Sequence, residues 1–157
     1  MTATSADWPP PRFDAGTVLF GIGNSARGDD GLGWAFLDRM RRQPGFAAQA
    51  EYRYQLQVED ALLASRFEQV VFVDASRATL PGGFRWAPCA ARAAAGFTTH
   101  ALPPSAVLQY CHTLYHARPR AGVLELQGQR WDLGTGLSET AAVNLAAALR
   151  FCGGDAG

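Results

Sequence analysis

Short runs of apolar residues alternate along this chain with segments of helical periodicity, and this alternation restricts the possible folds more than any other feature. Thr17–Ile22 (TVLFGI) and residues 70–73 (VVFV) have the continuous apolar character of strands that are buried on both faces. Between them, residues 32–42 repeat their apolar side chains at helical spacing. Strands that alternate with helices pair in parallel. The sequence therefore predicts an α/β fold, a single three-layer domain with a mostly parallel, twisted sheet sandwiched between helices.

The remaining elements and the domain limits follow from the same kind of pattern. We expect further strands over 51–57, 84–86 and 122–126, and further helices over 58–67, from Pro104 onward and from Ser138, which can cap the last helix. The domain is predicted to cover residues 17–152. A flexible leader, interrupted by three consecutive prolines, is expected over 1–16, and a short tail over 153–157.

Charge and composition exclude several classes of function. The 157 residues carry 14 basic and 14 acidic side chains, so the net charge is zero and the basic surface of a nucleic-acid binder is not expected. All 14 basic residues are arginine, which excludes a Schiff-base lysine and a Walker A lysine. No stretch approaches the roughly 18 apolar residues that a membrane helix needs, so no membrane partner is expected.

The three cysteines do not predict a metal knuckle or a disulfide framework. Cys89, Cys111 and Cys152 are odd in number and have no CxxC spacing, which favours a reduced, cytoplasmic setting. Cys111 lies on the apolar face of its predicted helix and is expected to be an inert core thiol. Cys89 lies in the irregular segment 87–101 and is the one thiol that remains a candidate for reaction.

A polar, glycine-rich loop over residues 23–31 (GNSARGDDG) follows the first strand. A glycine-rich turn between a strand and a helix is typical of dinucleotide sites, but here the glycine spacing is wrong. Two carboxylates, Asp29 and Asp30, would also repel a pyrophosphate and attract a cation. One aspartate is enough to support the following helix. We assign that structural role to Asp29, which leaves Asp30 free to point at the edge of the sheet.

Further polar residues are expected at the same edge. Asp74 follows the strand at 70–73, and His100 belongs to the irregular segment before the Pro104 helix. The carboxyl ends of parallel strands lie at one edge of a sheet, so the fold can bring these residues near Asp30. Because the segment 87–101 has no clear period, we also expect it to act as a lid or docking loop.

Four motifs occur along the chain in order: GIGNSARGDDGLG over 21–33, VVFVDA over 70–75, TTHALPP over 98–104 and GLS over 136–138. Together they resemble the [NiFe]-hydrogenase maturation endopeptidases, which trim the carboxyl end of the hydrogenase large subunit. The resemblance extends from residue 17 to residue 150. It implies a five-stranded twisted sheet between helices, which agrees with the fold predicted above.

The resemblance also implies a site. Asp30, Asp74 and His100 match the catalytic and metal-binding residues of the family, and the nickel is supplied by the substrate, with no tightly bound organic cofactor. Oxygen and imidazole donors with open coordination positions suit nickel or zinc, and a metal held there would polarise a peptide carbonyl. Either aspartate could move a proton.

Substrate contacts are expected from Gly23, Asn24 and Gln55. Two of the matched positions depart from the family pattern. Gln55 stands where many members have an aspartate, and Asp30 stands where glutamate is usual, which shortens the carboxylate arm by one methylene.

The function that the resemblance implies is removal of a C-terminal extension from a nickel-loaded [NiFe]-hydrogenase large-subunit precursor, by a metal-dependent endopeptidase. Two alternatives remain open at the level of the sequence. One is a non-catalytic maturation factor that binds the same large subunit. The other is a small-molecule enzyme on the same scaffold, because a fold does not by itself define a function.

Overall fold

The computed structural model describes residues 8–94 and 101–154, and its elements alternate as expected. They are β1 (Thr17–Ile22), the 3₁₀ turn η1 (Gly28–Gly31), α1 (Leu32–Met40), β2 (Gln49–Arg53), α2 (Asp60–Ala64), β3 (Gln69–Ser76), the 3₁₀ turn η2 (Pro81–Gly83), β4 (Phe84–Pro88), α3 (Pro104–Tyr115), β5 (Arg120–Gln127) and α4 (Glu139–Phe151). None of the helices in these two ranges is long and apolar enough to cross a membrane.

The strands form a five-stranded sheet in the order β2-β1-β3-β5-β4. The pairs β1–β2, β1–β3 and β3–β5 are parallel, and β4 joins β5 in antiparallel fashion at one edge. The predicted α/β class and the mostly parallel sheet are therefore confirmed. Parallel pairing places the ends of β1, β2 and β3 at one edge, where Ile22 pairs with both Arg53 and Asp74.

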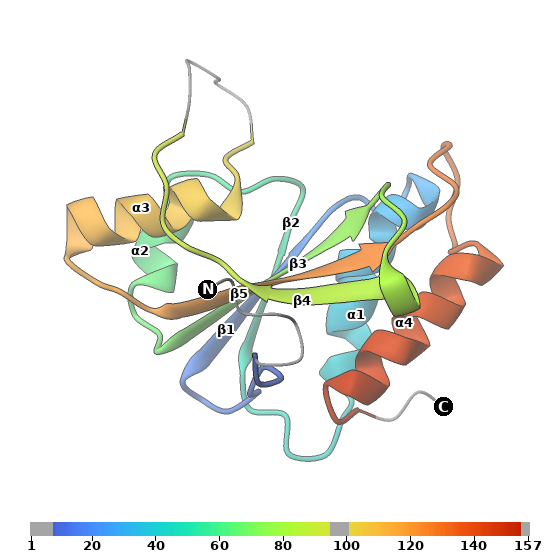
Figure 1. Ribbon diagram of the computed structural model, residues 1–157, viewed down its shortest axis with the longest axis horizontal. Helices are drawn as coiled ribbons and strands as arrows, with labels where there is room; N and C mark the ends of the chain where they lie inside the picture. Colours follow the sequence, from blue (N-terminus) through green and yellow to red (C-terminus); the bar gives the residue numbers. More distant parts are fainter. Residues whose placement is uncertain (1–7, 95–100, 155–157) are drawn as a thin grey trace.

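Helices cover both faces of the sheet, with α1 and α4 on one side and α2 and α3 on the other (Figure 1). Successive strand residues point to opposite faces, so Val71 packs toward α1 and α4, whereas Phe72 packs toward α2 and α3. Because both faces are buried, β1 and β3 are apolar throughout their central residues. Each large side chain buried in this way stabilises the fold by about 1.5–3 kcal/mol.

The described part of the predicted leader, residues 8–16, contacts the domain through aromatic side chains. Trp8 packs against Trp86 with ring centroids 6.2 Å apart, and the indole N–H of Trp86 donates to the carbonyl of Pro9 at 2.7 Å. Phe13 stacks on Phe46 at 6.0 Å. The aromatic side chains before and after the three prolines thus hold this segment against the domain.

The element boundaries differ most around β2 and α2. The strand is Gln49–Arg53 rather than 51–57, and the helix is Asp60–Ala64 rather than 58–67. The buried Asp60 explains the shift, because its carboxylate accepts hydrogen bonds from the Gln57 N–H at 3.0 Å and the Arg53 Nε at 3.0 Å. These bonds stabilise a turn between strand and helix. Gln55 consequently lies beyond the end of β2.

Candidate functional site

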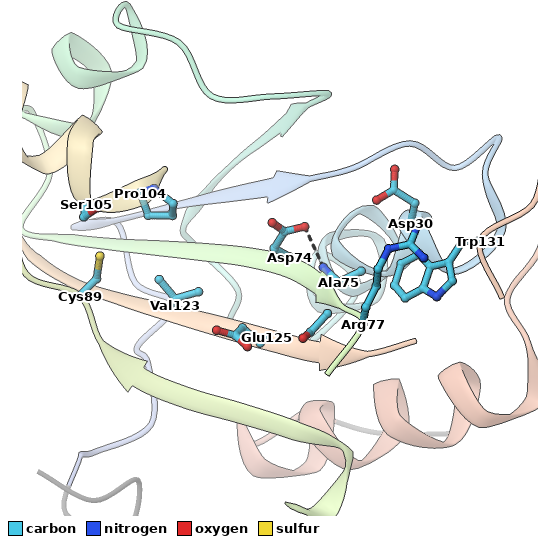
Figure 2. Close-up of a pocket in the computed structure, with 11 residues that line it drawn as sticks. Asp30, Asp74, Ala75, Arg77, Cys89, Pro104, Ser105, Val123, Glu125 and Trp131 are labelled. Atoms are coloured by element: carbon cyan, nitrogen blue, oxygen red, sulfur yellow. Dashed lines mark hydrogen bonds between the residues drawn. The ribbon is translucent and has the colours of Figure 1, made fainter. Parts of the chain in front are cut away.

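An open cavity of about 700 Å³ lies at the carboxyl ends of β3 and β5, on the side of the sheet that α3 covers (Figure 2). Its wall includes Asp30 from η1, Asp74 from β3 and Arg77 from the turn after β3. Cys89, just after β4, and Pro104, the first residue of α3, complete the other end. The structure therefore brings together two of the three residues that were predicted as catalytic and metal-binding.

Asp74 occupies a position where its negative charge is poorly compensated. It is in register with Glu125 of β5, and its carboxylate accepts a hydrogen bond from the Ala75 N–H at 2.8 Å. Burial raises the pKa of Asp74 to about 7, and the carboxylates of Asp30 and Glu125 add to the shift, against the Ala75 hydrogen bond. A carboxyl group with such a pKa exchanges its proton near neutral pH.

Asp30 is held by the backbone of the loop that follows β1. Gly23 has a φ of 148°, and a Cβ on it would overlap the carbonyl oxygen of Asp30, so only glycine fits there. The Asn24 N–H donates to that same carbonyl at 3.0 Å. Burial raises the pKa of the Asp30 carboxyl, although the charges of Arg77 and Arg27 act in the opposite direction.

Gly23 and Asn24 therefore lie next to Asp30 and fix its position, but neither residue is part of the cavity wall. Gln55 lines a separate cavity of about 480 Å³, together with Tyr54 and Asp60. The substrate contacts expected from these three residues remain a prediction.

Asp29, the neighbour of Asp30, points away from the cavity and is fully buried. Its carboxylate accepts hydrogen bonds from the N–H groups of Gln129 (2.7 Å), Arg130 (2.8 Å) and Ser138 (2.7 Å), and from the Ser138 hydroxyl (2.6 Å). Burial alone would raise the pKa of Asp29, but these hydrogen bonds outweigh it and lower the pKa. The structural role assigned to Asp29 is confirmed, but it anchors the loop after β5 instead of capping the adjacent helix.

His100 lies outside the described residues, as do residues 95–99 of the predicted lid segment 87–101. Residues 8–94 and 101–154 hold no group of three or more His, Cys, Asp or Glu side chains arranged to bind a metal ion. Within these ranges, the predicted ligand set is represented by the Asp30 and Asp74 carboxylates. The third ligand and the metal remain predictions.

Three charged or aromatic residues of the cavity wall, Glu125, Arg77 and Trp131, were missed by the sequence analysis. Glu125 is the one with a signal, because it interrupts an otherwise apolar predicted strand, and it forms an ion pair with Arg85 at 2.8 Å. Arg77 and Trp131 come from separate loops, and the guanidinium carbon of Arg77 lies 4.4 Å from the centroid of the Trp131 ring (Figure 2). No local pattern links these two residues.

The cysteines differ in their access to the cavity. Cys89 is part of its wall, but burial raises the pKa of its thiol to about 11, so the group is protonated at neutral pH and is a poor nucleophile. Cys111 is fully buried, and its thiol contacts the Ala61 carbonyl at 3.3 Å. It is the core thiol that the sequence predicts.

An α/β domain with a carboxylate-lined cavity at the carboxyl edge of its sheet is thus established, and solved structures share its fold. No protein-family model and no curated protein matches the chain. The hydrogenase maturating endopeptidase HybD from E. coli superposes with a TM-score of 0.65 over 85% of this chain and 87% of that chain, at 14% sequence identity.

Two archaeal structures give the same result. The [NiFe] hydrogenase maturation protease HycI from Thermococcus kodakarensis KOD1 has a TM-score of 0.60, covers 87% of both chains and is 24% identical. The hydrogenase 2 maturation peptidase from Thaumarchaeota archaeon SCGC_AB-539-E09 has a TM-score of 0.60 over 85% of this chain and 93% of that chain, at 17% identity. The chain therefore has the fold of hydrogenase maturation proteases, as the resemblance of its motifs implies.

Proposed function

We propose that this protein is an endopeptidase that removes the C-terminal extension of a [NiFe]-hydrogenase large-subunit precursor after the precursor has received nickel. One observation carries the proposal. Asp30 and Asp74, which come from two distant motifs, line a single open cavity in a domain with the fold of hydrogenase maturation proteases. A fold alone does not define a function, so the chemistry of this cavity supplies the remaining support.

The two carboxylates suit a cation that is presented by the substrate. Asp30 and Asp74 repel each other, and a divalent ion between them would remove that repulsion. Carboxylate oxygens are acceptable donors for nickel, and His100 is proposed as the third ligand. In this scheme the metal belongs to the substrate and polarises the scissile carbonyl, while the chain supplies the oxygen donors.

Proton transfer is assigned to the same pair of carboxylates. Asp30 or Asp74 would accept a proton from an attacking water and return it to the leaving amine. The protonated Cys89 thiol makes a cysteine nucleophile an unattractive alternative. We place the reaction in the cytoplasm, where the chain's free thiols would stay reduced.

The test uses the purified protein with a large-subunit precursor prepared in nickel-loaded and nickel-free forms. The expected result is shortening of the nickel-loaded precursor alone, measured by intact-protein mass spectrometry. Asp74→Asn and Asp30→Asn are expected to abolish cleavage. The control is Glu68→Gln, which makes the same change from carboxylate to amide beside the opposite end of β3, on a side chain that is 80% exposed.

Several results would count against the proposal. Equal cleavage of both precursor forms would remove the role of nickel. A stable complex without shortening would favour the non-catalytic maturation factor. If the precursor is neither bound nor cut, a thermal-shift screen with metals and small molecules would address the remaining alternative, because a specific ligand stabilises the folded state.

A further inference from the structure

Arg77 lies in the wall of the candidate active site, where its charge acts on Asp30 without a direct ion pair between them. Nowhere in the described ranges does its guanidinium form a hydrogen bond or an ion pair, although it carries five N–H donors. Two arginines of the sheet, in contrast, form ion pairs: Arg85 contacts Glu125 at 2.8 Å, and Arg53 contacts Asp60 at 3.0 Å. The donors of Arg77 are thus available to a ligand in the cavity.

The guanidinium is also supported by an aromatic side chain. Its carbon lies over the Trp131 ring, 4.4 Å from the centroid, and this cation–π contact limits the freedom of the group. Figure 2 shows Arg77 beside Trp131 and close to Asp30. A preoriented donor group loses less conformational entropy when it binds a ligand.

The Trp131 platform is itself firmly anchored. The hydrogen bonds from Gln129, Arg130 and Ser138 to the buried Asp29 carboxylate flank Trp131 on both sides in the sequence. The ring also packs so closely on Gly128 that a Cβ at Gly128 would lie 2.8 Å from it. The loop therefore presents the indole, and with it Arg77, at a defined place in the wall.

The charge of the cavity makes Arg77 the natural contact for a substrate oxygen. Among the described residues that line it, Asp30, Asp74 and Glu125 are acidic, and Arg77 is the one cation. The acidic side chains repel carbonyl and carboxylate oxygens of a substrate, and Arg77 attracts them. We propose that Arg77, stacked on Trp131, binds an acceptor oxygen of the substrate polypeptide beside the bond to be cleaved, and so positions the peptide against Asp30 and Asp74.

This inference rests on the proposed function, and its experiment separates the two. Arg77→Met removes the charge but keeps most of the stem, and Arg77→Lys keeps the charge but loses the planar fork. Arg120→Met is the matched control, because Arg120 also stacks on a tryptophan, Trp8, at 4.5 Å, at the beginning of β5 and outside the cavity wall. Precursor affinity is measured by interferometry in an Asp74→Asn background, and KM and kcat are measured in the wild-type background.

Arg77→Met is expected to raise both Kd and KM by about 10- to 100-fold, the usual effect of losing a hydrogen bond to a charged group, with a smaller change in kcat. Arg77→Lys should recover part of the loss, and Arg120→Met should bind like the wild type. To identify the acceptor, the measurement is repeated with precursors whose tails carry amides in place of acidic residues. If Arg77→Met still weakens the binding of these precursors, the acceptor is a main-chain carbonyl. If Arg77→Met no longer weakens it, the acceptor is an acidic side chain.

Unchanged Kd and KM in Arg77→Met would overturn the inference and leave the proposed function intact. A variant that only shifts the pH profile of cleavage would also overturn it, since Arg77 would then act on Asp30 alone. If the wild type binds the precursor without cutting it, the endopeptidase proposal fails while the Kd values still decide the role of Arg77. If the wild type neither binds nor cuts, both proposals fail.

Discussion

Asp29 is fully buried and Asp74 is half-buried, and their surroundings treat the negative charge in opposite ways. Asp29 accepts four hydrogen bonds, from Gln129, Arg130 and twice from Ser138, and its pKa is lowered. Asp74 accepts one from Ala75, lies near other carboxylates, and has its pKa raised to about 7. Burial alone does not decide the state of a carboxyl group, because the number of donors aimed at it can reverse the shift.

The difference separates two regions of the molecule. The loop that Asp29 anchors is built for stability, since every oxygen of the carboxylate is used. At the cavity edge, the charge of Asp74 has no compensating cation, which lowers stability and is typical of sites where charge is needed for chemistry. Four substitutions can test this contrast.

Asp29→Ala should have the largest effect on stability. It leaves the N–H groups of Gln129, Arg130 and Ser138 without their acceptor in a buried place, and we expect a loss of about 3–5 kcal/mol in the free energy of unfolding. Urea denaturation followed by fluorescence measures it. Asp132→Ala, at an exposed position of the same loop, is the control. A loss below about 1 kcal/mol would show that the anchor is unimportant.

Asp74→Asn should change how stability depends on pH. The folded protein binds the Asp74 proton more tightly than the unfolded chain does, so this group makes the protein less stable as pH rises from its ordinary pKa of 3.8 through about 7. At pH 8 the variant should be more stable than the wild type by up to about 4 kcal/mol, and near pH 3 the two should agree. Unfolding curves across this range supply the measurement, and parallel pH profiles would contradict the raised pKa.

Ser138→Ala should have an intermediate effect. The Ser138 hydroxyl donates to Asp29 at 2.6 Å and accepts from the Ala141 N–H at 3.1 Å as the N-cap of α4. Removing it is expected to lower stability by about 1–2 kcal/mol, measured by the same denaturation assay. Ser138→Thr keeps a hydroxyl and should retain most of the wild-type stability. Equal losses in both variants would contradict the role of the hydroxyl.

Asp30→Asn should have the smallest effect on stability. The side chain is only partly buried, and its charge is opposed by Arg77 and Arg27, so the free energy of unfolding should change by no more than about 0.5 kcal/mol. Cleavage of the precursor should nevertheless be lost. A variant that is both unstable and inactive would place Asp30 with Asp29, among the residues that maintain the fold.

The sequence predicted the elements that are buried on both sides. The bounds of β1, Thr17–Ile22, were predicted correctly, because a strand covered on both faces must be apolar at every position. The bounds of β2 and α2 were predicted less well. There the chain turns because the Asp60 carboxylate binds the Gln57 N–H and Arg53, and neither contact has a periodic signature.

By itself, then, the chain's sequence determined the α/β class and the meeting of Asp30 with Asp74, because parallel strands deliver their carboxyl ends to one edge. It indicated a structural role for Asp29, but not the loop that Asp29 anchors. Only the tertiary structure decided which groups complete that edge. Arg77 meets Trp131 because Asp29 holds the loop after β5 against the loop after β1. Such contacts depend on hydrogen bonds between segments far apart in the chain, and local patterns of residues do not record them.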